Sequence, residues 1–449
     1  MKRVRIGAGA GFADDRIEPA VDVTERGELD YLVFECLAER TIALAQLDRL
    51  RDPDTGFNEW LADRMEAVLP AAVAGGTKII TNMGAANPVA AARLVADIVA
   101  QHGCRLNVAA VTGDDVLSLI SGTDLPLQER QGTIASLGNT IVSANAYLGI
   151  EPLLDALQAG ADIVVAGRIA DPALFLAPLV HEFGWARNDW ATLGAGTAVG
   201  HLLECAGHAT GGYFADPGVK DVPDLAWLGF PLADVAENGG FVITKVPGSG
   251  GCVTVATVTE QLLYEVHNPS RYLTPDVVAD FSHAELRQVG DDHVAVSSIG
   301  GGPRPETLKV SVGYIDSCIG TGEISYAGPN AVARARLALD VVRQRLEALD
   351  IPLLEARYDL IGIDAVHRGA GSFVTGTPPE VRIRVAGRTT DLKQARRIGR
   401  EVTALWLNGP SGGAGATRTA VEDIAIVSVV LPRDAVRTTT TLVESENPA

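Results

Sequence analysis

The fold is decided by a short apolar run that ends on polar loop residues: residues 160–172 have the sequence GADIVVAGRIADP. Ile163, Val164 and Val165 predict a β-strand over residues 162–166, because β-branched residues favour strands. The run is continuously apolar, which is typical of a strand that is covered on both faces in a parallel sheet. Gly167 and Arg168 follow directly, so a small residue and a cation stand at the end of the strand.

The same alternation of strand and helix continues on both sides of this stretch. Apolar runs predict further strands at residues 4–8, 31–34, 78–81, 106–111 and 140–143, with helical patterns between them at residues 37–50, 58–74, 88–102, 114–120 and 151–159. This alternation is typical of a parallel sheet with covering helices. From about residue 240 the runs alternate more clearly in hydrophobicity and are separated by Gly and Pro, which indicates antiparallel strands.

The length of the chain indicates more than one domain. Single cores stop growing at about 250–300 residues, and this chain has 449. We expect an α/β fold, with a doubly wound, mostly parallel sheet in residues 1–235 that carries a cleft at its strand ends. Residues 236–437 are expected to form a second, mixed α+β domain with antiparallel strands and a closing βαβ-type unit. The Thr-rich residues 438–449 are expected to be a flexible tail.

Charge and composition exclude several classes of protein. The chain has 37 Lys and Arg against 56 Asp and Glu, a net charge of −19, which disfavours nucleic acid as a partner. No apolar run approaches the roughly 20 residues that a membrane span requires, and no signal peptide is recognisable. We therefore expect a cytoplasmic protein. The five cysteines are far apart and form no CxxC pair, so neither a disulfide framework nor a thiolate metal site is expected.

The first strand runs into alternating glycines. Gly7, Gly9 and Gly11 give G-x-G-x-G, which only partly matches the dinucleotide fingerprint G-x-G-x-x-G. The segment is interpreted either as a pocket for a phosphate or carboxylate with Arg16 as counter-charge, or as a tight turn at the sheet edge. We expect no redox cofactor.

Two further glycine loops, residues 247–251 and 408–415, lack the Gly-Lys-Ser/Thr ending of a phosphate loop. Such loops can form anion nests, and a coenzyme A thioester is a possible substrate. Lys245, Arg271 and Arg418 are the nearest cations. The helix stop at Gly409 is the alternative explanation of the second loop.

Ligands of open parallel sheets bind at the carboxyl ends of the strands, so the residues just after each predicted strand are candidate site residues. These residues are Glu35, Cys36, Asn82, Gly84, Asp114, Asn145, Tyr147, Arg168 and Asp171. Arg168 and Asp171 could hold a substrate carboxylate or phosphate, or could pair with each other and brace a loop.

Residues 200–218, GHLLECAGHATGGYFADPG, carry the densest set of reactive side chains. On a helix His201, Glu204, Cys205 and His208 would share one face. Glu204 or a histidine is a candidate general acid or base, and Cys205 a candidate nucleophile activated by His201. The alternative is a buried cysteine beside hydrogen-bonded histidines. The spacing is not H-E-x-x-H, so no metal is expected. Tyr213 is a candidate substrate-binding residue.

Taken together, these stretches resemble the acyclic terpene utilisation (AtuA-like) family over nearly the whole chain. The resemblance is carried by residues 34–39, 81–84, 111–115, 144–149, 160–172, 203–205, 210–218 and 257–266. It implies a role in catabolism of branched acyclic terpenoids and related acyl-CoA compounds. Longer members carry an additional C-terminal ferredoxin-like domain of about a hundred residues, which this chain is expected to lack. A separate small ferredoxin-like protein would then be a partner.

Two functions are compatible with these observations. The first is an enzyme of lyase or hydratase type acting on a branched acyl substrate by hydration, dehydration or carbon–carbon cleavage. Glu35, Glu204 or His201 would move protons, Cys36 or Cys205 would be the nucleophile, and Asn82, Tyr147 and Arg168 would orient the substrate. The second is a non-catalytic acyl-binding subunit that docks the small partner. The acidic surface and large fold are compatible with a homo-oligomer.

Overall fold

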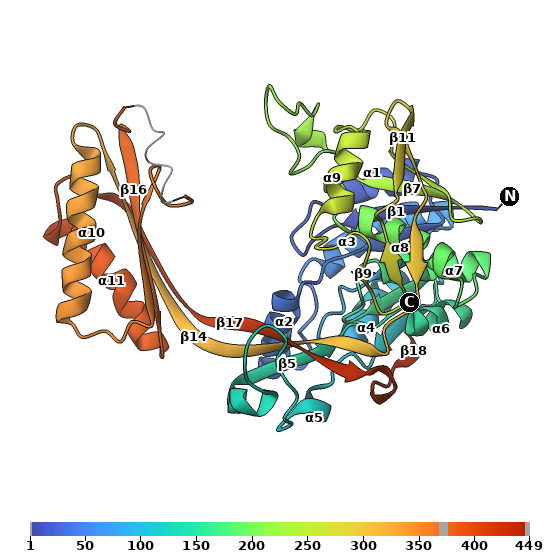
Figure 1. Ribbon diagram of the computed structural model, residues 1–449, viewed down its shortest axis with the longest axis horizontal. Coiled ribbons are helices and arrows are strands. Elements are labelled where there is room, and N and C mark those ends of the chain that lie inside the picture. Colours follow the sequence, from blue (N-terminus) through green and yellow to red (C-terminus); the bar gives the residue numbers. More distant parts are fainter. Residues whose placement is uncertain (1, 368–375, 445–449) are drawn as a thin grey trace. The chain divides into compact units, whose positions relative to one another are not determined.

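The computed structural model describes residues 2–367 and 376–444, which form two compact units (Figure 1). Unit 1 comprises Met1–Gly313 and Ile426–Ala449, and unit 2 comprises Tyr314–Ala425. The structure does not place the boundary between the two units at residues 235/236, where the sequence predicts it. Strands β7 (Pro231–Ala236) and β8 (Phe241–Lys245) join the sheet that is built from the first 170 residues, because β7 pairs directly with β1 (Arg3–Ala10).

Unit 1 is organised around a ten-stranded sheet with the order β11-β12-β8-β7-β1-β2-β3-β6-β4-β18. The remaining strands of this sheet are β2 (Tyr31–Phe34), β3 (Lys78–Thr81), β4 (Val108–Thr112), β6 (Ile163–Ala166), β11 (Glu285–Gly290), β12 (His293–Ser297) and β18 (Thr439–Val443). Strands β1, β2, β3, β6 and β4 run parallel to one another, and the other neighbours pair antiparallel. The sheet is therefore mixed, whereas a mostly parallel sheet was expected.

Unit 1 contains several helices, and α4 (Pro88–Gln101) and α8 (Trp190–Glu204) each begin with a side chain that caps the helix. The helices are α1 (Glu18–Arg26), α2 (Glu39–Arg51), α3 (Leu61–Gly75), α4, α5 (Leu117–Ile120), α6 (Glu151–Gln158), α7 (Ala173–Phe183), α8 and α9 (Val255–Leu263). The Asn87 side chain accepts a hydrogen bond from the Ala90 N–H at the start of α4, and the Asp189 side chain accepts one from Thr192 at the start of α8.

Short elements complete unit 1. A three-stranded sheet contains β9 (Tyr272–Leu273), β10 (Val278–Asp280) and β13 (Gly300–Gly302), and β5 (Ile141–Ala146) pairs with β14 (Thr307–Ala327). Single 3-10 turns lie at Ile134–Thr140, Ala206–His208, Leu225–Trp227 and Arg433–Ala435. Strand β18 pairs antiparallel with β4, so residues 439–443 are part of the sheet where a flexible tail was expected; residues 445–449 lie outside the described residues.

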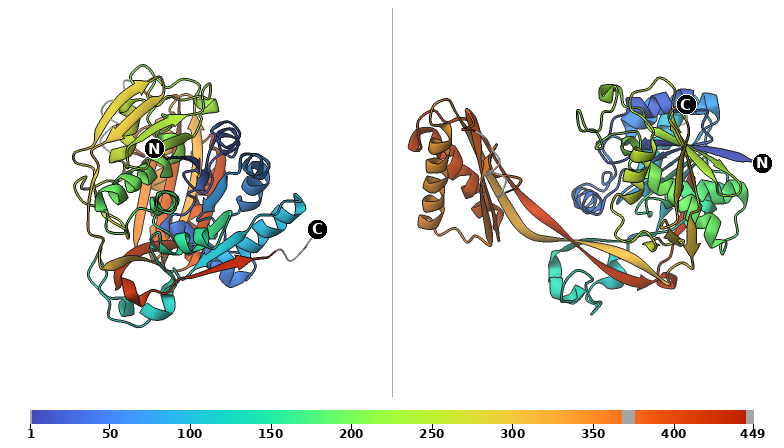
Figure 2. Two further views of the ribbon diagram at one scale, coloured as in Figure 1. Left: turned by 90° about the vertical axis from the view of Figure 1, so that its right-hand side faces the viewer. Right: turned by 45° about the horizontal axis from the view of Figure 1, so that its top comes forward.

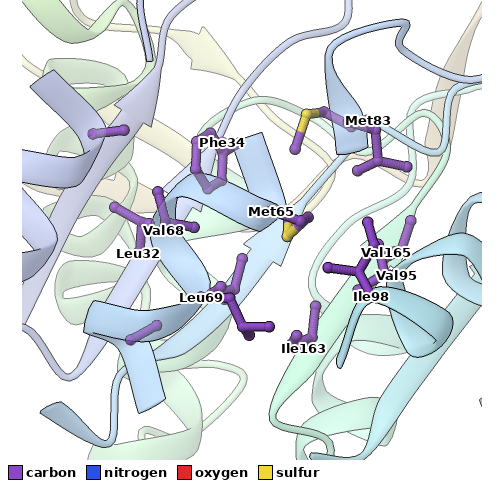
Figure 3. Packing of buried hydrophobic residues seen from close by; sticks show 14 of the residues in the cluster. Leu32, Phe34, Met65, Val68, Leu69, Met83, Val95, Ile98, Ile163 and Val165 are labelled. Carbon is purple, nitrogen blue, oxygen red and sulfur yellow. The ribbon is translucent and has the colours of Figure 1, made fainter. Parts of the chain in front are cut away.

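One hydrophobic core cluster of unit 1 lies between the parallel strands and the helices α3 and α4 (Figure 3). Fully or almost fully buried side chains converge from these elements: Leu32, Phe34, Met65, Val68, Leu69, Val95, Ile98, Ile163 and Val165. Burial of one such side chain contributes about 1.5–3 kcal/mol relative to its exposure. This packing fixes the strand ends on which the candidate site is built.

Unit 2 has the order of elements βαββαβ. Its elements are β14 (Thr307–Ala327), α10 (Ala331–Ala348), β15 (Glu355–Ile361), β16 (Glu380–Thr389), α11 (Leu392–Asn408) and β17 (Ala414–Pro432), and the strand order is β15-β16-β14-β17. Both boundaries of the unit fall inside the long strands β14 and β17. This is the ferredoxin-like arrangement, so the chain contains a unit of this kind within residues 314–425.

Both helices of unit 2 cover the same face of its sheet (Figures 1 and 2). Ala335 and Val342 of α10, and Ile398 and Val402 of α11, share one buried cluster with the strand residue Ile383. Within the described residues of the chain, no helix is long and apolar enough to cross a membrane.

Candidate active site

Arg168 is the centre of the candidate site. It follows β6 directly, and its side chain is fully buried. The guanidinium Nε–H and Nη2–H both donate to the Ile169 carbonyl, at 3.0 and 2.6 Å, and Nη1–H donates to the Leu37 carbonyl. Nη2–H also pairs with the Asp171 carboxylate, whose side chain remains 37% exposed. The cation therefore connects the loop after β6 with Leu37 in the loop after β2, and braces the loop after β6.

The backbone of Arg168 is fixed by a buried carboxyl group. Asp114 Oδ2 accepts hydrogen bonds from the Arg168 backbone N–H (3.0 Å) and from Asn145 Nδ2 (2.9 Å). Gly167 is required here, because a Cβ at this position would lie 2.7 Å from Asp114 Oδ1 and 2.8 Å from the Ala85 carbonyl oxygen. Burial raises the pKa of Asp114 to about 6, although its hydrogen bonds act in the opposite direction. Asp114 and Asn145 thus position the site and do not line its cavity.

Glu35 and Asn82 meet at the ends of the neighbouring strands β2 and β3. Asn82 Nδ2 donates to Glu35 Oε1 (2.9 Å), and Asn82 Oδ1 accepts from the Cys36 backbone N–H (2.8 Å). Burial raises the pKa of Glu35 well above its ordinary value, and the charge of Asp171 raises it further. Gly84 closes this loop against β6, because a Cβ there would lie 2.6 Å from the Ala166 carbonyl oxygen.

The Cys36 thiol lies beside a second buried arginine, Arg64. Arg64 Nη1–H donates to Cys36 Sγ (3.1 Å), and Arg64 Nη2–H donates to the Asp15 carbonyl (2.9 Å). Both side chains are fully buried. Burial raises the pKa of the Cys36 thiol, although the Arg64 charge opposes this effect. A thiolate is consequently disfavoured at this position.

A cavity of about 280 Å³ opens beside Asp171. Its lining consists of Tyr147, Ala170, Asp171, Pro172, Tyr272, Leu273, Thr274, Pro275, Pro305, Thr307, Leu308, Lys309 and Val430, all of unit 1. The wall is thus mostly apolar, with two tyrosines, one carboxylate and one ammonium group as its strongest polar features. Such a combination is typical of small-molecule sites, in which a few polar groups fix the ligand's orientation.

Tyr147 holds one side of this cavity. Its ring lies 4.6 Å from the Arg168 guanidinium and 4.9 Å from Lys309 Nζ, measured to the ring centroid. Its hydroxyl donates to Glu39 Oε1 (2.6 Å), which also pairs with Lys309 Nζ (3.1 Å). Burial acts to raise the pKa of Glu39, but the hydrogen bond from Tyr147 and the charge of Lys309 lower it to about 2. Glu39 is therefore ionised and fixes both cavity residues.

His201 and Glu204 face each other on α8, behind the other side of the cavity. Glu204 Oε1 lies 2.7 Å from His201 Nδ1, and His201 Nε2 lies 3.2 Å from the Leu262 carbonyl oxygen. Because a carbonyl can only accept, Nε2 carries a proton and Nδ1 is the acceptor of the neutral ring. The Glu204 carboxyl group must then donate. The Tyr272 hydroxyl, 3.5 Å from His201 Nδ1, connects this pair to the cavity wall.

The electrostatic environment agrees with this assignment. Burial lowers the pKa of His201 to about 4, which favours the neutral imidazole. Burial also raises the pKa of Glu204 well above its ordinary value, and the charges of Asp171 and Glu265 raise it further. Asp171 acts on both Glu35 and Glu204, so these carboxyl groups share one local field around Arg168.

Cys205 follows Glu204 at the end of α8 and is half-buried. Burial raises the pKa of its thiol, and Glu204 adds to the effect. Close packing explains the glycines in and just after β1, and only Gly11 packs against Cys205. A Cβ at Gly11 would lie 2.5 Å from the Cys205 carbonyl carbon, and one at Gly9 would lie 2.7 Å from the Phe34 ring.

Two predicted substrate-binding residues, Arg16 and Tyr213, lie in unit 1 but away from the cavity beside Asp171. Arg16 is exposed and donates to the Ala226 carbonyl (3.0 Å) in a surface hollow beside Trp227. Tyr213 is 89% exposed and contacts the rings of His208 and Tyr264 edge-on. Neither residue lines the cavity beside Asp171.

The sequence indicates Lys245 and Arg271 as cations for a coenzyme A tail. The Lys245 ammonium group pairs with Asp292 (3.1 Å) and donates to the Ser249 carbonyl (2.7 Å). Its charge is therefore already compensated within unit 1. The third cation, Arg418, lies in unit 2.

Comparison with known proteins identifies the family. Residues 4–442 match the family model of the acyclic terpene utilisation family protein AtuA. The chain belongs to this family. The match covers nearly the whole chain and includes both units. No curated protein and no solved structure shows significant similarity to the AtuA-family chain.

Sequence reasoning missed four residues of the AtuA-family site: Glu39, Arg64, Tyr272 and Lys309. Glu39 follows Glu35 by four positions, so its place after β2 was a usable signal. Tyr272 and Lys309 come from segments more than a hundred residues beyond the parallel strands, and no local pattern connects them with the site. In the part of the chain that the structure describes, no group of three or more His, Cys, Asp or Glu side chains is arranged to hold a metal ion.

Proposed function

We propose that this AtuA-family protein is an enzyme that acts on a small branched or acyclic carboxylic acid, or on its acyl-CoA form, by acid–base chemistry. The observation that carries the proposal is the Glu204–His201 pair behind Tyr272, on the same cavity as the Asp171 carboxylate. Glu204 thus holds a proton and the Asp171 carboxylate can accept one, and both groups serve a single small cavity. Hydration, dehydration and carbon–carbon cleavage all require this combination.

Asp171 is assigned as the general base. Its carboxylate lies on the cavity wall and is paired with the buried Arg168 guanidinium, which favours the ionised form. Burial opposes this effect and raises the pKa of Asp171 overall, which brings it closer to the value that an efficient base requires near neutral pH. Asp171 would accept a proton from the substrate carbon or from a water molecule.

Glu204 is assigned as the source of the proton that general acid catalysis requires. Its buried carboxyl group donates to His201 Nδ1, and the Tyr272 hydroxyl stands between this nitrogen and the cavity. The Tyr272 hydroxyl would donate a hydrogen bond to the substrate oxygen, and the Glu204–His201 pair would supply the proton that the leaving or adding group requires. This assignment uses no covalent intermediate.

The lining of the cavity supports an acyl substrate. Leu273, Pro172 and Val430 provide apolar contacts for a hydrocarbon chain, while Lys309 provides a positive charge for a carboxylate or thioester oxygen. The volume of about 280 Å³ lies just below the range of about 300–1,000 Å³ that is typical of ligand pockets, which suits the acyl portion alone. The family is implicated in acyclic terpene utilisation, and a branched acyl substrate is consistent with that role.

A nucleophilic role for Cys36 or Cys205 receives less support. Burial raises the pKa of both thiols, so the reactive thiolate is disfavoured. Among the described residues that line the cavity, neither cysteine is present. The acid–base assignment therefore rests on the carboxyl groups and not on sulfur.

The proposal is tested by native mass spectrometry of the purified protein with a panel of branched acids and their CoA thioesters. Turnover is expected as a change in ligand mass by one water or by a lost fragment, and the Asp171→Asn variant is expected to bind the same ligand without converting it. Wild-type protein that retains a ligand unchanged, with and without a small ferredoxin-like partner, would favour the non-catalytic binding subunit instead. The same spectra report whether the chain forms a homo-oligomer.

A further inference from the structure

Unit 2 carries a basic hollow that the proposed reaction does not use. The hollow has a volume of about 610 Å³ and is lined by Lys393, Arg396, Arg397, Arg400, Arg418, Thr419 and Ala420, all of unit 2. Five of these seven residues are cations, and none is acidic. The whole chain has a net charge of −19, so the hollow differs sharply from the average surface.

The helix α11 places four of these cations on one face. Residues 393, 396, 397 and 400 follow the spacing i, i+3, i+4 and i+7, which aligns their side chains along a helix. Arg418 is added from the strand β17. Gly399 allows the two elements to approach, because a Cβ there would lie 2.7 Å from the Arg418 Cβ.

The cations of the hollow have no carboxylate partners among the described residues. Arg397 donates to the side-chain oxygen of Gln394 (3.0 Å), which is an uncharged amide. Other arginines of unit 2 are paired, as Arg382 is with Glu323 (2.6 Å) and Arg384 with Asp359 (2.9 Å). The fold therefore compensates its cations elsewhere in the unit and leaves those of the hollow available to an external anion.

We propose that this basic hollow binds a small molecule that carries at least two phosphate groups. Guanidinium groups bind phosphate through paired hydrogen bonds, and several of them together suit a ligand with several phosphates. The volume lies within the range of about 300–1,000 Å³ that is typical of small-molecule sites. Among the described residues, no aromatic side chain lines the hollow, so recognition is assigned to the phosphates and not to a stacked base.

Two sources of such a ligand share this chemistry: inorganic pyrophosphate and the diphosphate of a nucleotide such as coenzyme A. A nucleic acid is disfavoured, because the net charge of −19 repels a long polyanion outside the hollow. This site goes beyond the proposed acid–base reaction and does not depend on it, since none of its residues lines the cavity beside Asp171.

The test is isothermal titration calorimetry of the full chain with inorganic phosphate, pyrophosphate and coenzyme A. Saturable binding of pyrophosphate or coenzyme A is expected, tighter than that of inorganic phosphate and weakened by added salt. The Arg400→Glu variant removes one phosphate contact and adds a repelling charge, so binding is expected to weaken by about tenfold or more.

The matched control is Arg336→Glu on α10, which changes the net charge by the same amount at an exposed position outside the hollow. It is expected to leave binding within about twofold of the wild type. An Arg396→Gln and Arg400→Gln double variant repeats the test without charge reversal, and circular dichroism reports folding of each protein.

Three results would overturn the proposal: no saturable binding of either diphosphate, binding that Arg400→Glu leaves unchanged, or binding of duplex DNA in the absence of diphosphate binding. A Lys309→Ala variant separates this site from the cavity of unit 1, because Lys309 lines that cavity and does not line the hollow. Coenzyme A binding that is lost in Lys309→Ala but retained in Arg400→Glu would assign the ligand to the cavity and remove it from the basic hollow.

Discussion

The two units handle positive charge in opposite ways. In unit 1, the fully buried Arg168 is surrounded by Asp171, Glu35 and Glu204, and the charge of Asp171 acts on both glutamates. In unit 2, five cations line one hollow, and among the described residues none of them pairs with a carboxylate. Around Arg168, carboxyl groups outnumber cations in a largely buried region. In the basic hollow, all charged residues of the described lining are cations, and they are accessible.

This difference indicates two kinds of chemistry. Burial of carboxyl groups raises their pKa values, so protons are held within the protein and can be exchanged with a substrate. An accessible cluster of guanidinium groups instead keeps its charge and attracts mobile anions. The site around Arg168 is consequently suited to proton transfer, whereas the basic hollow is suited to holding a phosphate-bearing ligand.

The largest effect is expected from Arg168→Ala. This change removes the partner of Asp171 and leaves the carbonyl groups of Leu37 and Ile169 without their donors. Leaving one buried acceptor without its donor typically costs about 1–3 kcal/mol, and two carbonyl groups lose their donor here. We expect a loss of this size in the free energy of unfolding, measured by urea denaturation, together with complete loss of turnover.

The matched control for this change is Arg64→Ala. Arg64 is equally buried, but its hydrogen-bond partners are a thiol, an amide oxygen, a thioether and a carbonyl, so its removal leaves no ionised carboxylate unpaired among the described residues. A smaller loss of stability is therefore expected. An equal or larger loss in Arg64→Ala would show that the acids around Arg168 do not depend on its charge.

The second effect is expected from Glu204→Gln. The glutamine amide can still donate to His201 Nδ1, so the fold is retained, but it cannot release a proton. Turnover is expected to fall by about 10²–10⁴-fold, the usual contribution of a general acid, while ligand affinity and the melting temperature stay close to those of the wild type.

The pH profile gives a second measure of the same group. Burial raises the pKa of Glu204, so the wild-type rate should fall as pH rises through that raised value and the acid form is lost. This alkaline limb should disappear in Glu204→Gln. The exposed Glu25→Gln serves as the control and should keep it. A Glu204→Gln enzyme with full activity would remove Glu204 from the mechanism.

Local sequence patterns predicted the parallel strands closely. The runs at residues 31–34 and 78–81 coincide with β2 and β3, and the predicted helix at 88–102 coincides with α4 apart from its last residue. Buried strands and capped helices leave a local signature, because their residues must satisfy burial and capping wherever the element packs. The strand-end rule then placed Glu35 and Asn82 near each other, and the structure shows them in direct hydrogen-bond contact.

Long-range pairing could not be predicted in the same way. Strands β7 and β8 join the sheet of unit 1 although they follow β6 by more than 60 residues, and β18 joins it from the end of the chain. The hydrogen bonds that decide these pairings are made between backbones and have no sequence signal. Tyr272 and Lys309 reach the cavity through such distant segments, which is why the sequence did not identify them.

A third, smaller effect is expected on the pH dependence of stability, and it arises from Asp114, the carboxyl group that positions Arg168. The folded-state pKa of Asp114 is about 6, above the ordinary value of 3.8. The folded protein therefore binds more protons than the unfolded chain between these values, and its stability should fall as pH rises from about 4 to about 6. The loss should reach at most about 3 kcal/mol.

Urea denaturation at several pH values measures this slope in the wild type and in Asp114→Asn, which lacks the titrating group. The variant should have a flatter profile. The control is Asp162→Asn, which removes a carboxyl group just before strand β6. This variant should retain the wild-type slope. A profile that is equally steep in Asp114→Asn would assign the pH dependence to another group.

The smallest effect is expected from Gly399→Ala, which changes the shape of the basic hollow without removing a charge. A Cβ at this position would lie 2.7 Å from the Thr321 carbonyl oxygen and 2.7 Å from the Arg418 Cβ, so α11 must move away from β14 and β17. Overpacking of this kind typically costs about 1–3 kcal/mol, and pyrophosphate should bind more weakly because Arg418 is displaced. Gly302→Ala, where an added Cβ meets no atom within 4 Å, should change neither quantity. Weaker binding in Gly399→Ala would mean that the spacing of the five cations matters as well as their number. Unchanged binding together with lower stability would mean that the hollow attracts phosphate by charge alone.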